Sequence, residues 1–283
     1  MTEPDPTYNT IMAVSVGLGL VMLALLGYRL ASGGTVRRRG WAVAFAVLGG
    51  ILVLTGGHMT LTWPLSGPTA FDNIAFGETS LGMGAILLGV AFLIGSDRSW
   101  RLLGDRTAPP PATTAEAAAD VVPDELTAAH WPRLASLLQP LSWFGAVMGL
   151  ALIAIAFVGP IYEPWEAPPQ EPISGEFTDV EWLENWFLAL LYAGVGVGAI
   201  LTPFALARRT IGGARGLLRV IAALFAITGI VWTLFGAMNY YTHIGLTINT
   251  YEEQSAAQQA QEQQQDEPSP NEDYEQTAPP SGG

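Results

Sequence analysis

Six long hydrophobic stretches divide the chain, and shorter polar segments separate them. An α-helix rises 1.5 Å per residue, so about 20 apolar residues are needed to cross roughly 30 Å of bilayer hydrocarbon. The stretches have suitable lengths, and no amphipathic helices are present that would cover them in a soluble core. We therefore predict an all-α fold, an integral membrane bundle of six transmembrane helices, over residues 8–30, 41–61, 79–95, 141–161, 186–207 and 217–240.

The positive charges alternate between the segments that connect these predicted spans. All twelve are arginines: four follow the first span, four follow the third and four follow the fifth. The segments after the second and fourth spans have none, and neither do the termini. Because cytoplasmic segments retain arginine and lysine during insertion, the pattern predicts that both termini are extracytoplasmic (N-out/C-out). It also supports an even number of spans, since one span more or fewer would break the alternation.

The connecting segments divide the chain into four parts. Residues 1–95 form a first three-span half and residues 141–250 a second one. Between them, residues 96–140 are predicted to be a cytoplasmic linker, because their middle is rich in alanine, threonine and proline. The final residues, 251–283, contain eight acidic and no basic residues with little hydrophobic content. A disordered acidic tail on the outer side is therefore predicted.

Small residues recur within the spans. Glycines separated by one residue occur in spans one, three and five, and glycines separated by three residues occur in spans four and five. Such residues let helix backbones approach closely, so a compact bundle is predicted rather than a pore lining. The recurrence leaves open whether the two halves are a repeat. The glycines are Gly17, Gly19, Gly82, Gly84, Gly145, Gly149, Gly194, Gly196 and Gly198.

Composition narrows the possible partners and chemistry. Only 13% of the residues are charged, against about 25% in a soluble domain, so the lipid bilayer is the expected environment. The absence of cysteine excludes a disulfide framework and a cysteine-ligated metal. The net charge of −13 gives no basic surface, so nucleic acid is not an expected partner. A membrane-protein partner or a homo-oligomer remains open.

The most distinctive segment follows the second span. Pro64-Leu65-Ser66-Gly67 leads to Asn73-Ile74-Ala75-Phe76-Gly77-Glu78 at the head of the third span. This segment resembles a family of prokaryotic multi-span membrane proteins that is classed only as a domain of unknown function. The matching residues are Pro64, Gly67, Asn73, Phe76, Gly77 and Glu78.

The resemblance implies a multi-pass protein of a prokaryotic cell membrane and no particular activity. The family often has proline after the glutamate, where this chain has Thr79. Read from the residues alone, Glu78 suits the start of a helix, because a carboxylate there interacts favourably with the helix dipole. Asn73 or Thr79 could cap that helix.

Three polar residues at the outer ends of the spans are candidates for a shared metal site. His58 lies near the end of the second span, Glu78 opens the third, and His243 follows the sixth. Imidazole and carboxylate groups together suit zinc or another transition metal, and two imidazoles could ligate haem iron. The spacing of the three residues matches no metal motif. Structural roles at the membrane interface are therefore the competing interpretation.

Three classes of function are compatible with the sequence. A non-enzymatic structural or accessory membrane component fits best, because no catalytic or cofactor signature is present and no catalytic residue can be named. A small-solute or ion transporter is an alternative, although such proteins usually carry ionisable groups in mid-span. A haem- or metal-dependent protein with an outer-face histidine site is the third possibility. No cofactor is predicted outside that last alternative.

Overall fold

The computed structural model of the chain describes residues 9–97, 124–165, 168–180 and 182–266, with side chains described as far as residue 263. The chain divides into two compact units. One comprises Met1–Glu166 with Asp179–Tyr240, and the other comprises Ala167–Thr178 with Tyr241–Gly283.

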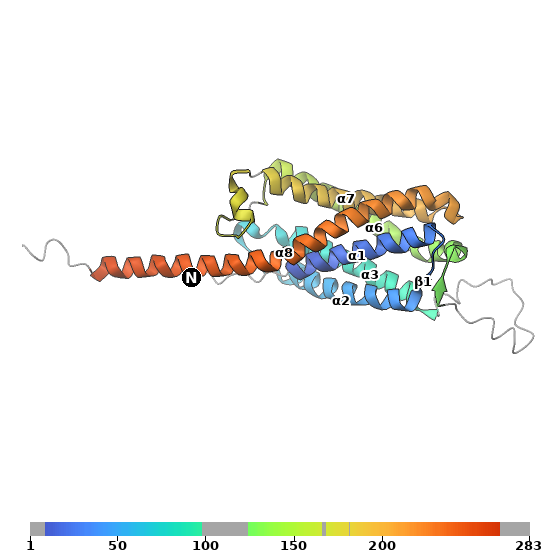
Figure 1. Ribbon diagram of the computed structural model, residues 1–283, viewed down its shortest axis with the longest axis horizontal. Coiled ribbons are helices and arrows are strands. Elements are labelled where there is room, and N and C mark those ends of the chain that lie inside the picture. Colours follow the sequence, from blue (N-terminus) through green and yellow to red (C-terminus); the bar gives the residue numbers. More distant parts are fainter. Residues whose placement is uncertain (1–8, 98–123, 166–167, 181, 267–283) are drawn as a thin grey trace, which may run out of the picture. The chain divides into compact units, whose positions relative to one another are not determined.

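Six helices in the described part of the chain are long and apolar enough to cross a membrane, as the hydrophobic pattern predicts (Figure 1). The chain is thus a helical, multi-pass membrane protein. The helices are α1 (Asn9–Ala31), α2 (Arg38–Thr62), α3 (Thr79–Gly95), α6 (Trp131–Tyr162), α7 (Trp182–Leu206) and α8 (Ile211–Asp266).

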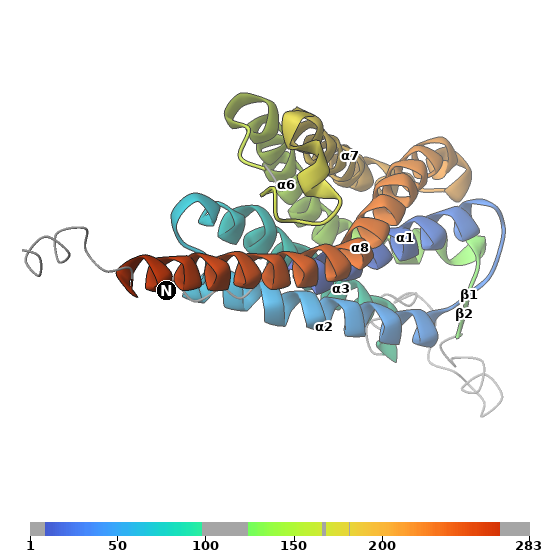
Figure 2. The same cartoon turned by 60° about the vertical axis from the view of Figure 1, so that its left-hand side comes forward.

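Two short strands close one end of α1 and α2 (Figure 2). β1 (Val36–Arg37) pairs antiparallel with β2 (Glu125–Leu126), and Val36 lies opposite Leu126. The first residue of α2, Arg38, is fully buried beside this pair. Its guanidinium pairs with the Asp97 carboxylate and also donates to the carbonyl oxygens of Ile94 and Gly95, the last residues of α3. These contacts join the start of α2 to the end of α3.

The fourth span begins earlier than predicted. α6 starts at Trp131, where the hydrophobic pattern predicted a start at residue 141. Pro132 lies in the first turn of α6, where its missing N–H removes no hydrogen bond and its fixed φ suits a helix. A 3-10 turn, Ala128–His130, precedes the helix. The linker predicted over residues 96–140 is therefore shorter, and residues 98–123 of it lie outside the described residues.

The sixth helix extends much further than predicted. α8 continues through Tyr251 to Asp266, although a disordered tail was predicted from residue 251. Residues 252–266 are rich in alanine, glutamine and glutamate, which are favourable helix formers, so a helix that has already nucleated can propagate through them. Residues 267–283 lie outside the described part.

Glycines bring the helices of the first unit into backbone contact. A Cβ atom added to Gly196 of α7 would lie 2.7 Å from the carbonyl oxygen of Gly149 in α6. The same holds between α2 and α3, where a Cβ at Gly84 would lie 2.9 Å from the carbonyl oxygen of Gly49. Both pairs of helices lie side by side (Figures 1 and 2). The predicted packing role of the small residues is confirmed here.

The first and last helices of the bundle also meet at glycines. A Cβ at Gly229 of α8 would lie 2.8 Å from the carbonyl oxygen of Gly17 in α1. About two turns further along α8, a Cβ atom added to Gly236 would lie 2.7 Å from the backbone nitrogen of Val14 in α1. A helix of the predicted second half therefore packs directly on a helix of the first. Whether the two halves are a repeat stays a prediction.

Candidate functional site

A tight connection between α2 and α3 positions the residues of the motif. α2 ends where Trp63 adopts a left-handed conformation (φ 50°), and Pro64 prevents the helix from continuing. Gly67 has φ 61°, a conformation that favours glycine. Asn73 is fully buried and holds the connection together, because its Nδ2 donates to the carbonyl oxygens of Leu65 (2.8 Å) and Ala70 (2.9 Å). The backbone N–H of Leu65 donates to its Oδ1 (3.3 Å).

A π-helix, Asn73–Glu78, leads directly into α3. The wider π turn places Phe76 on the inner side of the bundle and Gly77 against α2, where an added Cβ would lie 2.8 Å from the Cβ of Met59. The prediction that Asn73 or Thr79 caps α3 is wrong. The Asn73 side chain bonds the preceding connection, and the Thr79 hydroxyl donates backwards to the carbonyl oxygen of Ala75 (2.6 Å).

Glu78 lies at the junction of the π-helix and α3 with an exposed side chain. It makes no side-chain cap hydrogen bond to α3. The helical geometry already begins at residue 73, so Glu78 is not at the first turn, where the helix dipole would act on it most strongly. Of the six motif residues, Asn73, Phe76 and Gly77 thus have clear packing or hydrogen-bonding roles, and Pro64 and Gly67 shape the turn.

An aromatic cluster lies against the inner side of the π-helix. Tyr192 of α7 is buried at its centre, with the Trp165 ring stacked on it (centroids 5.8 Å apart, 21°) and the Trp232 ring edge-on to it (5.5 Å, 75°). Phe76 contacts both Tyr192 and Trp232, and Phe71 meets Trp165 edge-on. The Tyr192 hydroxyl donates to the carbonyl oxygen of Ala75 (2.9 Å). Side chains from α7, α8, the connection between α2 and α3 and the segment after α6 therefore meet in one place.

A buried carboxylate adjoins this cluster. Asp72 interacts with the side chains of both Trp165 and Tyr192. The Asp72 Oδ1 atom and the Trp165 indole Nε1 atom are both inaccessible to solvent. Neither atom makes a hydrogen bond to another of the described residues. The indole N–H and the carboxylate are complementary, so a small displacement would join them. Asp72 precedes α3 and Trp165 follows α6, so the two side chains bring these segments into contact.

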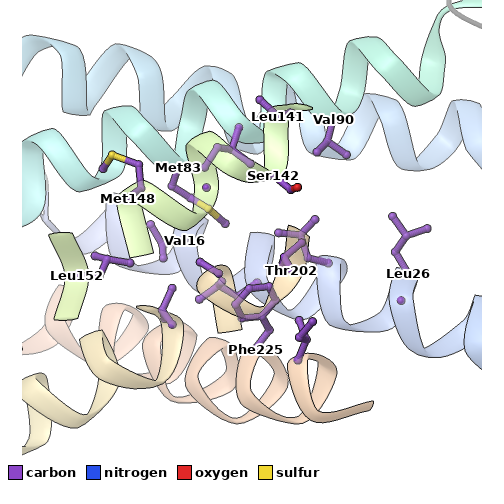
Figure 3. A pocket seen from close by; sticks show the side chains of 18 of the residues that line it. Val16, Leu26, Met83, Val90, Leu141, Ser142, Met148, Leu152, Thr202 and Phe225 are labelled. Atoms are coloured by element: carbon purple, nitrogen blue, oxygen red, sulfur yellow. The ribbon is translucent and has the colours of Figure 1, made fainter. Parts of the chain in front are cut away.

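An apolar cavity of about 210 Å³ lies within the same unit (Figure 3). Phe76, Tyr192 and Trp232 of the aromatic cluster line part of it. Five helices and the π-helix line it, whereas α2 contributes no residue. The walls are mainly leucine, isoleucine, valine and methionine, with no acidic, basic or histidine side chain. Representative lining residues, all labelled in Figure 3, are Val16, Leu26, Met83, Val90, Met148 and Phe225.

The hydroxyl groups in the cavity wall are largely used within the protein. Thr202 donates to the carbonyl oxygen of Gly198 (2.9 Å), and Ser142 donates to that of Gln139 (2.6 Å). The hydroxyls of Thr79 and Tyr192 both bond the carbonyl oxygen of Ala75. These bonds leave the wall with an almost entirely hydrocarbon character. The cavity therefore suits an apolar molecule rather than a hydrated or charged one.

The three predicted metal ligands lie in different units. His58 and Glu78 belong to the first unit, and both side chains are exposed. The ring Nδ1 of His58 lies 3.3 Å from the Thr62 hydroxyl. His243 belongs to the second unit, where its Nε2 lies 3.8 Å from the Glu171 carboxylate. Among the residues that the structure describes, no three histidine, aspartate or glutamate side chains are grouped to hold a metal ion. The shared site of His58, Glu78 and His243 stays a prediction.

Sequence reasoning did not find the cavity, Asp72 or the cluster around Tyr192. The sequence does contain a signal for Asp72, because this acid stands directly before the π-helix Asn73–Glu78, in a connection between two apolar spans. Trp165, in the segment after α6, is also buried against Tyr192. The cavity is lined by side chains from five helices, so the sequence pattern of one helix does not predict it.

The comparison with known proteins identifies the family but no activity. A family model described as "Protein of unknown function (DUF981)" matches residues 6–245, nearly all of the membrane-spanning part. The chain belongs to this family. No curated protein and no solved structure matches it.

Proposed function

We propose that this member of the family of proteins of unknown function is a non-enzymatic protein of the cell membrane that binds an apolar, lipid-derived molecule in its bundle. The observation that carries the proposal is the cavity of about 210 Å³ with hydrocarbon walls. It combines the accessory role that the sequence favours with a specific binding site. The alternatives, a transporter and a metal- or haem-dependent protein, gain less support from this geometry.

The size of the cavity supports a bound molecule. Protein interiors are close-packed and contain few voids larger than a water molecule. An unfilled space of about 210 Å³ leaves its walls without van der Waals partners, which is a cost in free energy. Apolar cavities do not recover this cost by admitting water, because water needs two to four polar partners. An apolar guest restores the lost van der Waals contacts.

The chemistry of the walls favours a flexible hydrocarbon chain. Methionine is unbranched and adapts to irregular guests, and Met12, Met83 and Met148 line the cavity from three different helices, α1, α3 and α6. The bilayer supplies such chains at high concentration, as acyl tails or as isoprenoid tails. An ion pathway usually presents ionisable groups, so this lining favours an uncharged ligand over an inorganic ion.

A cavity-filling variant with a matched control tests the proposal. Gly145 of α6 lines the cavity, and a Cβ there would make only ordinary contact, 3.7 Å from the Cδ1 of Ile86. Gly145→Leu should therefore fill the space without moving backbone. Gly50→Leu on α2 is the control, because a Cβ at Gly50 meets nothing within 4 Å and α2 does not line the cavity.

The measurement uses photoactivatable alkyl-diazirine probes in liposomes, followed by mass spectrometry of the labelled peptides. We expect labelling of Met83 or Met148 in the natural sequence and in Gly50→Leu, and loss of that labelling in Gly145→Leu. Extraction of the purified protein then distinguishes acyl from isoprenoid chains. Labelling confined to lipid-facing residues such as Leu54 and Phe92 in all three proteins would overturn the proposal.

A further inference from the structure

The second compact unit leaves an apolar stripe of helix α8 uncovered. Tyr241, Ile244, Ile248 and Tyr251 are 65%, 60%, 52% and 72% exposed. Their spacing of three, four and three residues is the a/d spacing of a heptad repeat, which places them on one side of a helix. We propose that this stripe is the interface with a second copy of the chain, a parallel two-stranded coiled coil.

The segment lies beyond what a bilayer can cover. α8 has 56 residues, which at 1.5 Å per residue is about 84 Å, whereas the hydrocarbon core is roughly 30 Å thick. The uninterrupted apolar part ends near Tyr240, and polar residues are frequent after it. Lipid tails therefore do not explain the exposed isoleucines at positions 244 and 248.

Other positions of the same helix already have a partner, and one of them flanks the stripe: in the heptad frame Asn249 is at b, His243 at c and Gly245 at e. The segment before the 3-10 helix Ser174–Val180 packs there: Asn249 donates to the carbonyl oxygen of Gln170 (2.7 Å), and His243 lies beside Glu171. Gly245 faces Pro172 so closely that a side chain would not fit. These contacts involve residues 243, 245 and 249, whereas the four residues of the stripe stay exposed and can contact another molecule.

Three features of the stripe favour a second copy as that molecule. Two copies in one membrane have the same orientation, so their α8 helices are parallel and can meet in register. The stripe carries no charge, and the flanking e position Glu252 would lie across from the uncharged g position Thr247 of the other copy, so no like charges are paired. Heptad spacing is also self-complementary, because a and d residues insert between their own counterparts.

The available area agrees with such an interface. A buried aromatic side chain covers about 150–250 Å², so four half-exposed or more exposed residues offer roughly 400 Å² per copy. A stable interface buries about 800 Å² per partner. In sequence, the same spacing runs back through earlier residues of α8, in the first unit, that are at least half exposed. They are Val220, Ile227, Ile230 and Leu234.

Disulfide cross-linking of the full-length protein in its membrane tests the interface. The chain has no cysteine, so single substitutions need no background removal. Ile244→Cys and Ile248→Cys lie on the stripe, where a parallel coil brings equivalent residues within disulfide reach. Leu246→Cys and Glu253→Cys lie at f positions on the far side and are the matched controls.

We expect an oxidised dimer band for the two stripe variants and its loss for the two controls. In the double variant Ile244→Glu, Ile248→Glu, the mass in detergent should fall from dimer to monomer with an unchanged helix content by circular dichroism, because both side chains are exposed within one copy. Equal cross-linking at all four positions would overturn the proposal, as would a monomeric mass for the natural sequence. Neither result depends on whether the cavity binds a ligand.

Discussion

The Tyr192 hydroxyl donates a 2.9 Å hydrogen bond to the carbonyl oxygen of Ala75, a residue 117 positions earlier in the chain. Ala75 belongs to the π-helix, in which the wider turn alters the regular hydrogen-bond pattern. The same carbonyl oxygen also accepts from Thr79 (2.6 Å). The bond therefore ties α7 to the start of α3 and holds the aromatic cluster at the border of the cavity.

We predict that Tyr192→Phe lowers the free energy of unfolding by about 1–2 kcal/mol, because a buried hydrogen bond between neutral groups is lost while the ring is kept. The melting temperature of the protein in detergent measures this effect. Tyr162→Phe is the control, since Tyr162 is 76% exposed at the end of α6. Equal melting temperatures for both variants would show that the Tyr192 bond does not contribute.

Two residues of the motif, Asn73 and Glu78, should contribute differently to the stability of the protein. Asn73→Ala removes all three hydrogen bonds to Leu65 and Ala70 from a fully buried position and leaves two carbonyl groups without these bonds. We expect a loss of about 2–4 kcal/mol, since each unsatisfied buried group costs about 1–3 kcal/mol. Glu78→Gln should leave the melting temperature unchanged, because its side chain is exposed. The reverse order would mean that the Glu78 carboxylate, and not the Asn73 amide, supports the fold.

Two adjacent arginines should behave differently. The Arg38 side chain is fully buried and pairs with Asp97, whereas the Arg39 side chain is 65% exposed. Each hydrogen bond from the Arg38 guanidinium to the carbonyl oxygens of Ile94 and Gly95 involves a charged group and contributes about 1.5–3 kcal/mol, whereas an exposed ion pair contributes about 0–1 kcal/mol. Arg38→Gln should therefore lower the melting temperature strongly, and Arg39→Gln hardly at all. Since both changes remove one positive charge, a similar loss in both variants would point to net charge rather than to the buried pair.

The helices could be predicted because each depends on a local property of the chain. Twenty apolar residues cross a bilayer wherever they occur, so all six spans were found, and α3 begins and ends at the predicted residues. The start of α6 and the end of α8 were missed for a related reason. Hydrophobicity marks the part of a helix that lies in lipid, whereas Trp131 and Asp266 lie outside the apolar stretches.

The candidate site could not be predicted because it depends on contacts between distant segments. A transmembrane helix is apolar on all sides, so the pattern does not reveal that Met83 faces a cavity while Phe92 of the same helix is exposed. The glycines were an exception, because small residues mark close approach independently of the partner. Gly149 was predicted to be a packing residue, but only the structure identifies Gly196 as its neighbour.

The Gly149–Gly196 contact gives a prediction for assembly of the bundle. Gly149→Val would place a side chain 2.7 Å or less from the carbonyl oxygen of Gly196, which has no flexible atoms that could move away. We expect α6 and α7 to separate and the protein to be degraded or to aggregate on extraction. Gly50→Val should be extracted as a well-behaved protein, because its Cβ meets nothing within 4 Å. The elution profile from size-exclusion chromatography distinguishes the two outcomes.

The orientation in the membrane remains to be tested, and the absence of cysteine makes it accessible to labelling. Arginines cluster after the first, third and fifth spans, so Arg209, exposed between α7 and α8, should lie in the cytoplasm. Gln254, 45 residues further along and past the apolar part of α8, should then lie outside. In intact cells, a membrane-impermeant maleimide should label Gln254→Cys at once and Arg209→Cys only after permeabilisation. The opposite order would invert the bundle and violate the positive-inside rule at all three arginine clusters. Labelling of both variants in intact cells would mean that α8 does not cross the membrane.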